Sequence, residues 1–397
     1  MPSLPNPTLR LGRRSAADVV GLDIQPGHIA AVQARVNGSV VAERAATLPL
    51  PADTVREGEV LDESVLGESL RALFRDSGLS KRVRIGVANQ RTVLRTLELP
   101  PITDRKELDA AVRFQAQEQV PMPLANAVLD FHALGVHDTP VGPRQQVVLV
   151  AAQRDMVARL LAAVRSAGLR PEGVDLSAFA LIRSLYRSDA EHDGRVLYLN
   201  VDGLTNMAIA EGAVCRFTRV VGGGLEAMAS ELAERRGVAV ADARASIATA
   251  ELPAQPAPAQ ESTVPPPVLP EEDVTAVVDA PSPEPEPELA VDTDGLSADT
   301  DLRVVLENGI REIAGEVRNS LEFHRSQEGG GEVTLVVLSG AALDVPGFAD
   351  SLEAELGVAV TRETVGMADG ALDGAGDVSP QRLAVAAGLA IEEAHTQ

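Results

Sequence analysis

A strand–turn–strand pattern occurs twice in this chain, about one domain apart. The first copy is VVGLDIQPGHIAAVQARVNG (19–38) and the second is VLYLNVDGLTNMAIAEGAVC (196–215). In each copy a short apolar run ends in Asp23 or Asn200, and a turn then leads into an alternating strand. The repeat predicts two hairpins that face each other across a cleft, each with a carboxylate or an amide at its tip.

Two facing hairpins of this kind are typical of the phosphate-binding loops of the actin-like ATPase fold. Backbone N–H groups in such turns can bind a polyphosphate, and an acidic tip can hold its metal through water. The pattern therefore predicts a cleft for ATP with Mg²⁺, in which Asp23 would bind the Mg²⁺ through water. No catalytic residue is indicated by the pattern.

The composition limits the partners of the chain. Its 397 residues are enough for two domains with sizeable cores. With 35 basic and 58 acidic residues, the net charge of -23 argues against direct binding to nucleic acid or to an anionic membrane. The chain has no Trp and two Tyr, so a base-stacking platform is not expected. The single cysteine, Cys215, is expected to be a buried residue in a reducing compartment.

Two segments are expected to lie outside the folded body. The first residues, MPSLPNPTLRLGRR, contain no apolar signal region. No stretch of the sequence approaches the about 18 apolar residues of a membrane span. Together these features indicate a cytoplasmic protein without direct membrane insertion. Residues 252–300 contain 11 Pro, 11 Asp or Glu and no Lys or Arg. Such a segment buries too little apolar surface to order itself, so it is predicted to be a disordered loop. A docking segment for a basic partner is the alternative.

The remaining pattern is that of an α/β protein. The segment 104–120 has Asp104 as N-cap and ends before Pro121, and the segment 154–167 is followed by Gly168. Further helices are expected along the apolar stripe from Ile310 to Leu321, and from Pro346 as first residue to Gly357. Strands are expected near 18–24, 28–36, 83–88, 92–98, 147–152, 195–201, 206–210, 214–221 and 333–339.

Four stretches resemble the PilM family of type IV pilus assembly proteins and, more distantly, the division protein FtsA. They are GLDI with IAAVQ (21–33), RTLELPPITDRKELDAAVRFQAQEQVPMPLANAVLDFHALG (95–135), VVLVAAQRDMVARLLAAVRSAGLRPEGVDLSAFALIRS (147–184) and LSGAALDVPGFADSLEAELGVAV (338–360). The resemblance implies two actin-like domains and a small extra subdomain. The expected boundaries are 1–17 for an N-terminal tail, 18–194 for domain 1 with the extra subdomain at about 95–170, and 195–393 for domain 2, interrupted by 252–300.

The first phosphate loop departs from the pattern of this family. The family reads Asp-Ile-Gly-Ser with a following Lys, whereas this chain has Gln25, Pro26 and Ala30 at the Gly, Ser and Lys positions. Pro26 lacks an N–H donor, and Gln25 places a side chain where glycine lets a phosphate approach, although Gly27 partly restores the turn. The candidate ligand-binding residues of this loop are Asp23, Gln25, Pro26, Gly27 and His28.

The second phosphate loop is also altered. The family's Asp is Asn200, an amide that binds Mg²⁺ more weakly than a carboxylate, although Asp202 can substitute. The candidate residues here are Asn200, Asp202, Gly203, Thr205 and Asn206. Both loops are thus degraded, so ATP with Mg²⁺ is expected to bind weakly or not at all.

Three other features complete the expected nucleotide site. Gly340, Ala341 and Ala342 match the family's adenosine motif, or alternatively form a tight strand–helix turn. Gly222 and Gly223 precede a helix whose N–H groups can face a phosphate, or form a plain turn. Asp242 lies where the family often has a ribose-binding Glu, or is a solvated helix residue.

The resemblance implies a cytoplasmic scaffold of the pilus machine. It would bind the cytoplasmic N-terminal tail of a PilN-like inner-membrane protein, together with other pilus components, and would be recruited to the inner face of the membrane by that partner. Phe131 and His132 would line the partner groove or pack in the subdomain. A small-molecule kinase of the same fold, or an FtsA-like division protein, are the alternatives, and any ATPase activity would be weak.

Overall fold

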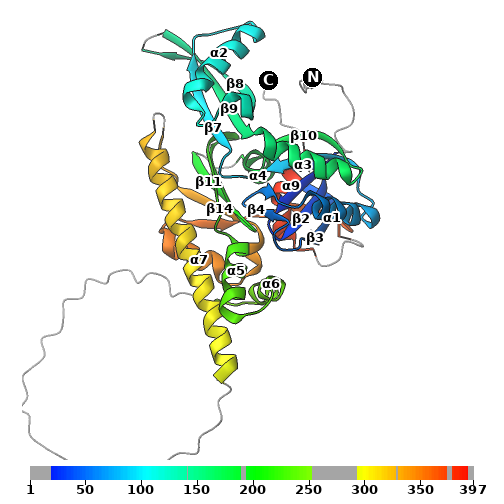
Figure 1. Ribbon diagram of the computed structural model, residues 1–397. Helices are drawn as coiled ribbons and strands as arrows, with labels where there is room; N and C mark the ends of the chain where they lie inside the picture. The colour runs from blue at the N-terminus through cyan, green and yellow to red at the C-terminus, as the bar shows by residue number, and fades with distance from the viewer. Residues whose placement is uncertain are drawn as a thin grey trace, which may run out of the picture.

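The computed structural model describes residues 19–140, 142–188, 194–252, 293–327, 330–372 and 378–391, with backbone alone for 293–298. The predicted N-terminal tail, 1–17, and most of the predicted acidic loop lie outside these ranges. Figure 1 shows two sheet-based domains beside each other, a small subdomain above them and a long helix along one side.

The first sheet is built around the first predicted hairpin. Its strand order is β10-β6-β1-β2-β3-β16. The central strand β1 is antiparallel to β2 and parallel to β6, and β6 is parallel to β10. Every residue of β1 is buried, as expected for an apolar strand covered on both faces. The bounds are β1 (Val20–Gln25), β2 (His28–Asn37), β3 (Ser39–Pro49), β6 (Arg82–Val87), β10 (Arg170–Leu176) and β16 (Gly366–Met367).

The second sheet repeats this plan. Its strand order is β13-β12-β11-β14-β15, and its central strand β11 is antiparallel to β12 and parallel to β14. The second predicted hairpin therefore occupies the place in this sheet that the first occupies in the other. The bounds are β11 (Arg195–Val201), β12 (Thr205–Glu211), β13 (Val214–Val221), β14 (Leu335–Ser339) and β15 (Val360–Arg362).

Two short helices connect the two sheets. Helices α4 (Ser177–Leu185) and α9 (Ala384–Ala390) pack on each other, and one apolar core joins them to strands of both sheets. Helix α9 ends against two arginines: Arg84 donates to the carbonyl oxygens of Leu389 and Ile391, and Arg183 donates to that of Gly388. These bonds satisfy carbonyl groups that a helix C-terminus otherwise leaves without partners.

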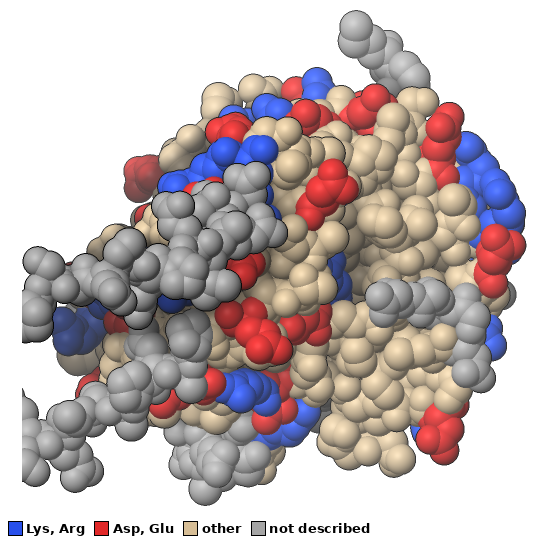
Figure 2. All heavy atoms as spheres, turned by 90° about the horizontal axis from the view of Figure 1, so that it is seen from below, with Lys and Arg blue, Asp and Glu red and all other residues tan. Residues whose placement is uncertain are grey.

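Other helices cover the outer faces of the sheets. Helices α1 (Glu63–Asp76) and α3 (Arg154–Ser166) share a core with the first sheet. The second sheet packs against α5 (Leu225–Arg236), α6 (Val240–Ala248), α7 (Thr293–Ser326) and α8 (Phe348–Leu356). Seen from below, the described surface carries acidic and basic side chains along its rim, acidic side chains near its centre and a broad uncharged area to the right (Figure 2).

The extra subdomain is a three-stranded sheet with one helix on it. Its strand order is β7-β9-β8, and the apolar face of α2 packs on one side. Helix α3 packs in the first domain, so the subdomain ends at β9 and the predicted boundary near 170 lies about one helix too late. The bounds are β7 (Val93–Leu99), α2 (Arg105–Gln119), β8 (Ala127–Thr139) and β9 (Gly142–Gln153), and the minor elements elsewhere are β4 (Val55–Arg56), β5 (Glu59–Val60), η2 (Leu124–Asn126), η4 (Ala341–Asp344) and η5 (Pro380–Leu383).

The predicted helix ends are partly confirmed. Asp104 caps α2 by accepting from the N–H groups of Lys106 and Glu107. Pro346 is not the first residue of α8, because Gly347 is the N-cap in a left-handed conformation with φ 82°. Helix α7 begins at Thr293, inside the range predicted as a loop to residue 300. The polar segment 293–300 is thus the first two turns of an amphipathic helix whose apolar stripe starts later.

Candidate functional site

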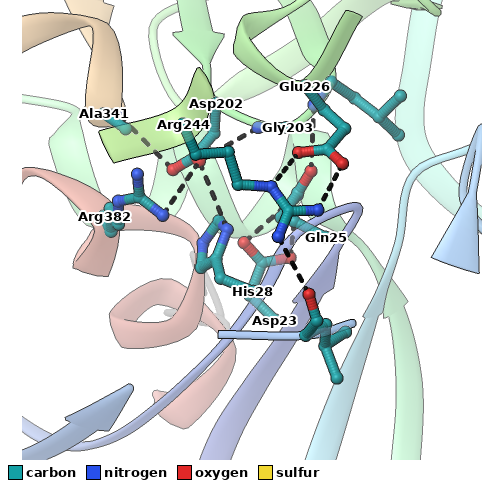
Figure 3. A network of polar contacts seen from close by, with 11 residues as sticks. Asp23, Gln25, His28, Asp202, Gly203, Glu226, Arg244, Ala341 and Arg382 are labelled. Atoms are coloured by element: carbon teal, nitrogen blue, oxygen red, sulfur yellow. Dashed lines mark hydrogen bonds and ion pairs between the residues drawn. The ribbon is translucent and has the colours of Figure 1, made fainter. Parts of the chain in front are cut away.

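The two hairpin tips contact each other where the two domains meet (Figure 3). The turn between β1 and β2 contains Pro26 and Gly27, and the turn between β11 and β12 contains Gly203. A Cβ atom on Gly203 would lie 2.2 Å from the carbonyl oxygen of Pro26. Only glycine fits at that distance, so the structure brings the two predicted phosphate loops together and leaves no layer of ligand between them at this point.

Gln25 joins the two loops through its side chain. Its Nε2 donates to Asp23 Oδ1 at 3.1 Å and to Oδ2 at 3.2 Å, and its Oε1 accepts from the backbone N–H of Leu204 at 3.4 Å. Asp23 is 3 % exposed and Gln25 is 1 % exposed. The carboxamide therefore fills the space in front of Asp23, which is the space that a hydrated metal would need.

The buried environment changes the protonation of Asp23. Desolvation and, to a smaller extent, the charge of Asp202 raise the pKa of this carboxyl to about 7, although the hydrogen bond from Gln25 opposes both effects. A carboxyl with this pKa is partly protonated at neutral pH. It is consequently a weaker ligand for a hydrated Mg²⁺ than an ordinary aspartate.

His28 faces the carboxylate of the second loop. Its Nδ1 lies 3.4 Å from Asp202 Oδ1. Burial lowers the pKa of His28 to about 4, and the nearby Asp202 carboxylate only partly opposes this shift. The imidazole is therefore neutral at neutral pH, and the contact joins a neutral N–H to a carboxylate.

Asp202 is surrounded by donors. Its Oδ1 accepts from the N–H of Gly203 at 3.0 Å, and its Oδ2 accepts from that of Ala341 at 3.4 Å. The guanidinium of Arg382, in η5, lies 3.9 Å from Oδ1. Figure 3 shows His28, Ala341 and Arg382 converging on this one carboxylate. Both carboxylate oxygens of Asp202 thus contact groups of the protein itself.

The predicted adenosine motif is also packed against the second loop. Ser339 donates to Asn200 Oδ1 at 3.0 Å, so the amide oxygen expected to face a metal is already used. Gly340 has φ 95°, and a Cβ there would lie 2.4 Å from the carbonyl oxygen of Val201. Ala341 and Ala342 are buried in η4 behind it. Close packing of this turn against the second loop therefore explains why its residues are small.

Some polar atoms in this region have no partner. Thr205 and Asn206 begin β12 and are buried. Among the described residues, Thr205 Oγ1, both amide atoms of Asn206 and His28 Nε2 make no hydrogen bond. Buried polar groups are normally satisfied, so these atoms are exceptions within the site.

An ion pair that the sequence did not indicate closes one side of the site. Arg244 on α6 donates through Nε to Glu226 Oε2 at 2.7 Å, and its Nη2 contacts the other carboxylate oxygen. Its Nη1 donates to the carbonyl oxygen of Leu50, in the first domain, at 3.0 Å. A Cβ on Gly27 would lie 2.6 Å from Glu226 Oε2. Glu226 and Arg244 are 18 residues apart, and no local spacing marks them as a pair.

Three predicted residues are not part of this cluster. Gly222 lies beside Gln90, and Gly223 lies beside the carboxylate of Glu312, which does not favour a phosphate. Asp242 is exposed in the first turn of α6. Gly224, which follows Gly223, is the glycine that meets the second loop: its Cβ would lie 2.7 Å from the carbonyl oxygens of Asp202 and Gly203.

This arrangement does not fit a magnesium nucleotide. Between the loops, Gln25 and His28 contact groups of the second loop and Pro26 touches Gly203, although Thr205 and Asn206 keep unpartnered polar atoms. Within the described ranges, no three His, Cys, Asp or Glu side chains are grouped so that they could ligate a metal directly. In the same ranges, every helix is too short or too polar to span a bilayer.

Comparison with known proteins identifies the family. A family model described as Type IV pilus assembly protein PilM matches residues 21–257, more than half of the chain. The chain belongs to the PilM family. The match confirms the resemblance inferred from the four stretches of sequence.

Solved structures confirm the fold. The chain is similar to a PilM–PilN type IV pilus biogenesis complex, with a TM-score of 0.69, 23% identity, and coverage of 95% of this chain and 98% of that one. This PilM family member therefore has the actin-like ATPase fold with the extra subdomain. Other similar structures are EutJ of Carboxydothermus hydrogenoformans, with TM-score 0.44, 14% identity and coverage of 94% and 88%, and AMPPNP-bound MreB 5 of Spiroplasma citri, with TM-score 0.44, 9% identity and coverage of 93% and 94%.

Proposed function

We propose that this PilM family member is a scaffold of the type IV pilus assembly machine, and that it binds the cytoplasmic tail of a PilN-like inner-membrane protein. The observation that carries the proposal is the match over 95% of the chain to the PilM–PilN complex, together with the family match. Binding of the tail recruits the scaffold to the inner face of the membrane and brings it to other pilus components. No observation favours a small-molecule kinase or an FtsA-like protein.

We place the tail on the face of β8 that points away from α2. This face carries Val128, Asp130 and His132, which are exposed, while Leu129 and Phe131 alternate with them and pack in the α2 core. His132 is paired in register with Val148 of β9, which is buried against the main body. The surface therefore lies beside the junction of the subdomain with the first domain, and β8 is one of the two edge strands of its sheet. An edge strand and exposed apolar side chains suit an extended peptide.

Titration of a labelled tail peptide, followed by fluorescence anisotropy, tests this proposal. The peptide is taken from the PilN-like protein encoded in the same genome. Val128→Asp is expected to weaken binding about tenfold or more, because it places a charge in an apolar contact. Val136→Asp changes an exposed valine near the far end of the same strand and is the matched control. Equal affinity of both variants and the unaltered chain would place the tail elsewhere, and no binding of the unaltered chain would reject the function.

The nucleotide cleft is proposed to bind ATP with Mg²⁺ weakly if at all. Gln25 and Pro26 replace the residues that give a phosphate room and a donor, and the oxygen of Asn200 accepts from Ser339. If weak Mg²⁺-dependent binding exists, Asp23 is the residue that would hold the metal through water, and Asp23→Ala is expected to abolish it. Calorimetry with and without Mg²⁺ measures both.

A further inference from the structure

The two domains are connected at their cleft by side chains of the chain itself. Leu204 N–H donates to Gln25 Oε1 at 3.4 Å, and His28 Nδ1 lies 3.4 Å from Asp202 Oδ1. Arg244 of the second domain donates to Leu50 O of the first at 3.0 Å. Each of these contacts crosses from one domain to the other at the place where the family's fold would present its phosphate loops.

We propose that Gln25, His28 and Arg244 form an internal latch that takes the place of a nucleotide and keeps the two domains closed without any ligand. This goes beyond the scaffold function and does not depend on the partner. A nucleotide can close such a cleft because phosphate oxygens accept N–H groups from both loops at once. Here the amide oxygen of Gln25 accepts the N–H of the second loop while its NH₂ group stays on the carboxyl of the first.

The positive charge that a metal would bring is supplied by arginine. The guanidinium of Arg382 lies beside Asp202, and that of Arg244 pairs with Glu226 next to Gly27. Glu226 and Arg244 are both less than one quarter exposed. A partly buried carboxylate left alone would be unfavourable, and a paired guanidinium that also donates to a carbonyl removes this penalty. The acidic side chains at the cleft are thus neutralised without Mg²⁺.

Direct contact of the loops makes the latch and the ligand mutually exclusive. The separation of Pro26 and Gly203 admits no Cβ, and therefore no phosphate. A nucleotide could enter only after Gln25 released the N–H of Leu204 and the two tips moved apart. The closed arrangement is consequently expected to be the resting state of the free protein, with tail binding insensitive to ATP.

Hydrogen exchange followed by mass spectrometry tests the latch in the full chain. Arg244→Ala and Gln25→Ala are expected to speed exchange about tenfold in both loops, at 21–29 and 200–206, because each removes a contact that crosses the cleft. Arg235→Ala removes an exposed ion pair with Glu231 on α5 and is the matched control, expected to leave both loops unchanged. The proposal would be overturned if exchange became faster in only one of the two loops, or if neither variant changed the exchange rate of either loop.

A second measurement needs no variant. The melting temperature of the unaltered chain is expected to stay the same as Mg²⁺-ATP is raised to about 5 mM, because a ligand stabilises a protein only by binding its folded state. Exchange in both loops is also expected to stay the same. A saturable rise in melting temperature accompanied by slower exchange in both loops would show that nucleotide closes the cleft, and would overturn the latch. Neither result bears on binding of the tail.

Discussion

At the scale of single residues, polar side chains of the cleft bind partners in the other domain that the sequence did not predict. The sequence showed that Gln25, Pro26 and Asn200 depart from the family's loops, and this local chemistry could be predicted because it depends on neighbouring residues. It did not show that Gln25 would reach Leu204, 179 residues away, or that Arg244 would reach Leu50. Such pairs depend on how two domains are placed, which no local spacing encodes.

The raised pKa of Asp23 predicts a pH-dependent stability. The folded-state pKa is about 7 and the ordinary value is 3.8, so the folded chain binds a proton more strongly, and this contribution is lost as pH rises through 7. The loss is at most about 4 kcal/mol. Asp23→Asn removes it, so the stability of the variant relative to the unaltered chain is expected to increase between pH 5 and pH 8.

Urea denaturation at both pH values measures this difference. His28 changes stability in the opposite sense, because its lowered pKa favours folding above 6.5 and this contribution is lost as pH falls through about 4. His28 is present in both the Asp23→Asn variant and the unaltered chain. Its contribution therefore cancels in their difference in stability, as long as His28 and residue 23 titrate independently. Asp242→Asn, which alters an exposed carboxyl, is the control and is expected to differ from the unaltered chain equally at pH 5 and pH 8.

Restoring the family's first loop is expected to create nucleotide binding. Gln25→Gly with Pro26→Ser frees the N–H of Leu204, adds a backbone donor at residue 26 and opens the space before Asp23. Calorimetry should find tighter Mg²⁺-ATP binding than in the unaltered chain. The single change Pro26→Ser, which keeps the Gln25 contacts, is the control. Similar binding by both variants would mean that Gln25 does not block the site.

At the scale of elements, the repeated hairpins and the capped helix α2 were predicted because their signals are local. Strands β3, β8 and β10 and helices α1, α4 and α9 were not predicted. Helix α4 is almost entirely buried, and so is α9, so neither shows the polar–apolar period of a surface helix. Residues of β8 alternate, but their outer face contains Val128 and Val136, which weakens the pattern.

The arginine cap of α9 gives a prediction at this scale. Arg84→Met leaves the carbonyl groups of Leu389 and Ile391 without this donor, and is expected to lower the free energy of unfolding by about 2–3 kcal/mol. Arg82→Met, on the same strand, removes a surface ion pair with Glu172 and should lower it by less than about 1 kcal/mol. Equal losses in urea denaturation would show that the cap has no special importance.

At the scale of the whole molecule, the interruption between Leu252 and α7 defines a test of the predicted acidic loop. Leu252 is buried and donates to the carbonyl oxygen of Pro346, so it belongs to the second domain. Replacing residues 254–292 by a short Gly/Ser bridge is expected to change the melting temperature little, because shortening a flexible loop alters closure entropy by about 1 kcal/mol. Replacing 246–252 as well is the control, and should destabilise the domain. A large loss from the first change alone would show that the segment packs on the body.

The net charge of the chain determines whether it binds an anionic membrane directly. On the described part of the face in Figure 2, basic side chains alternate with acidic ones, and the chain carries a net charge of -23. Anionic vesicles are therefore expected not to bind the protein, but to bind it when they display a PilN-like tail. Cosedimentation at physiological salt measures both, with neutral vesicles as the control. Binding to bare anionic vesicles would contradict recruitment through a partner.

The position of α9 between the sheets sets the order in which the chain can fold during synthesis. Most of the first sheet is translated early. The carbonyl groups that Arg84 binds extend to Ile391, which is translated 307 residues later. At about 5–20 residues per second, the ribosome needs roughly 15 to 60 s to supply them. Throughout that interval the inner face of the first sheet lacks its covering helix and is exposed to solvent or to a chaperone. The domain that is made first is thus completed among the last.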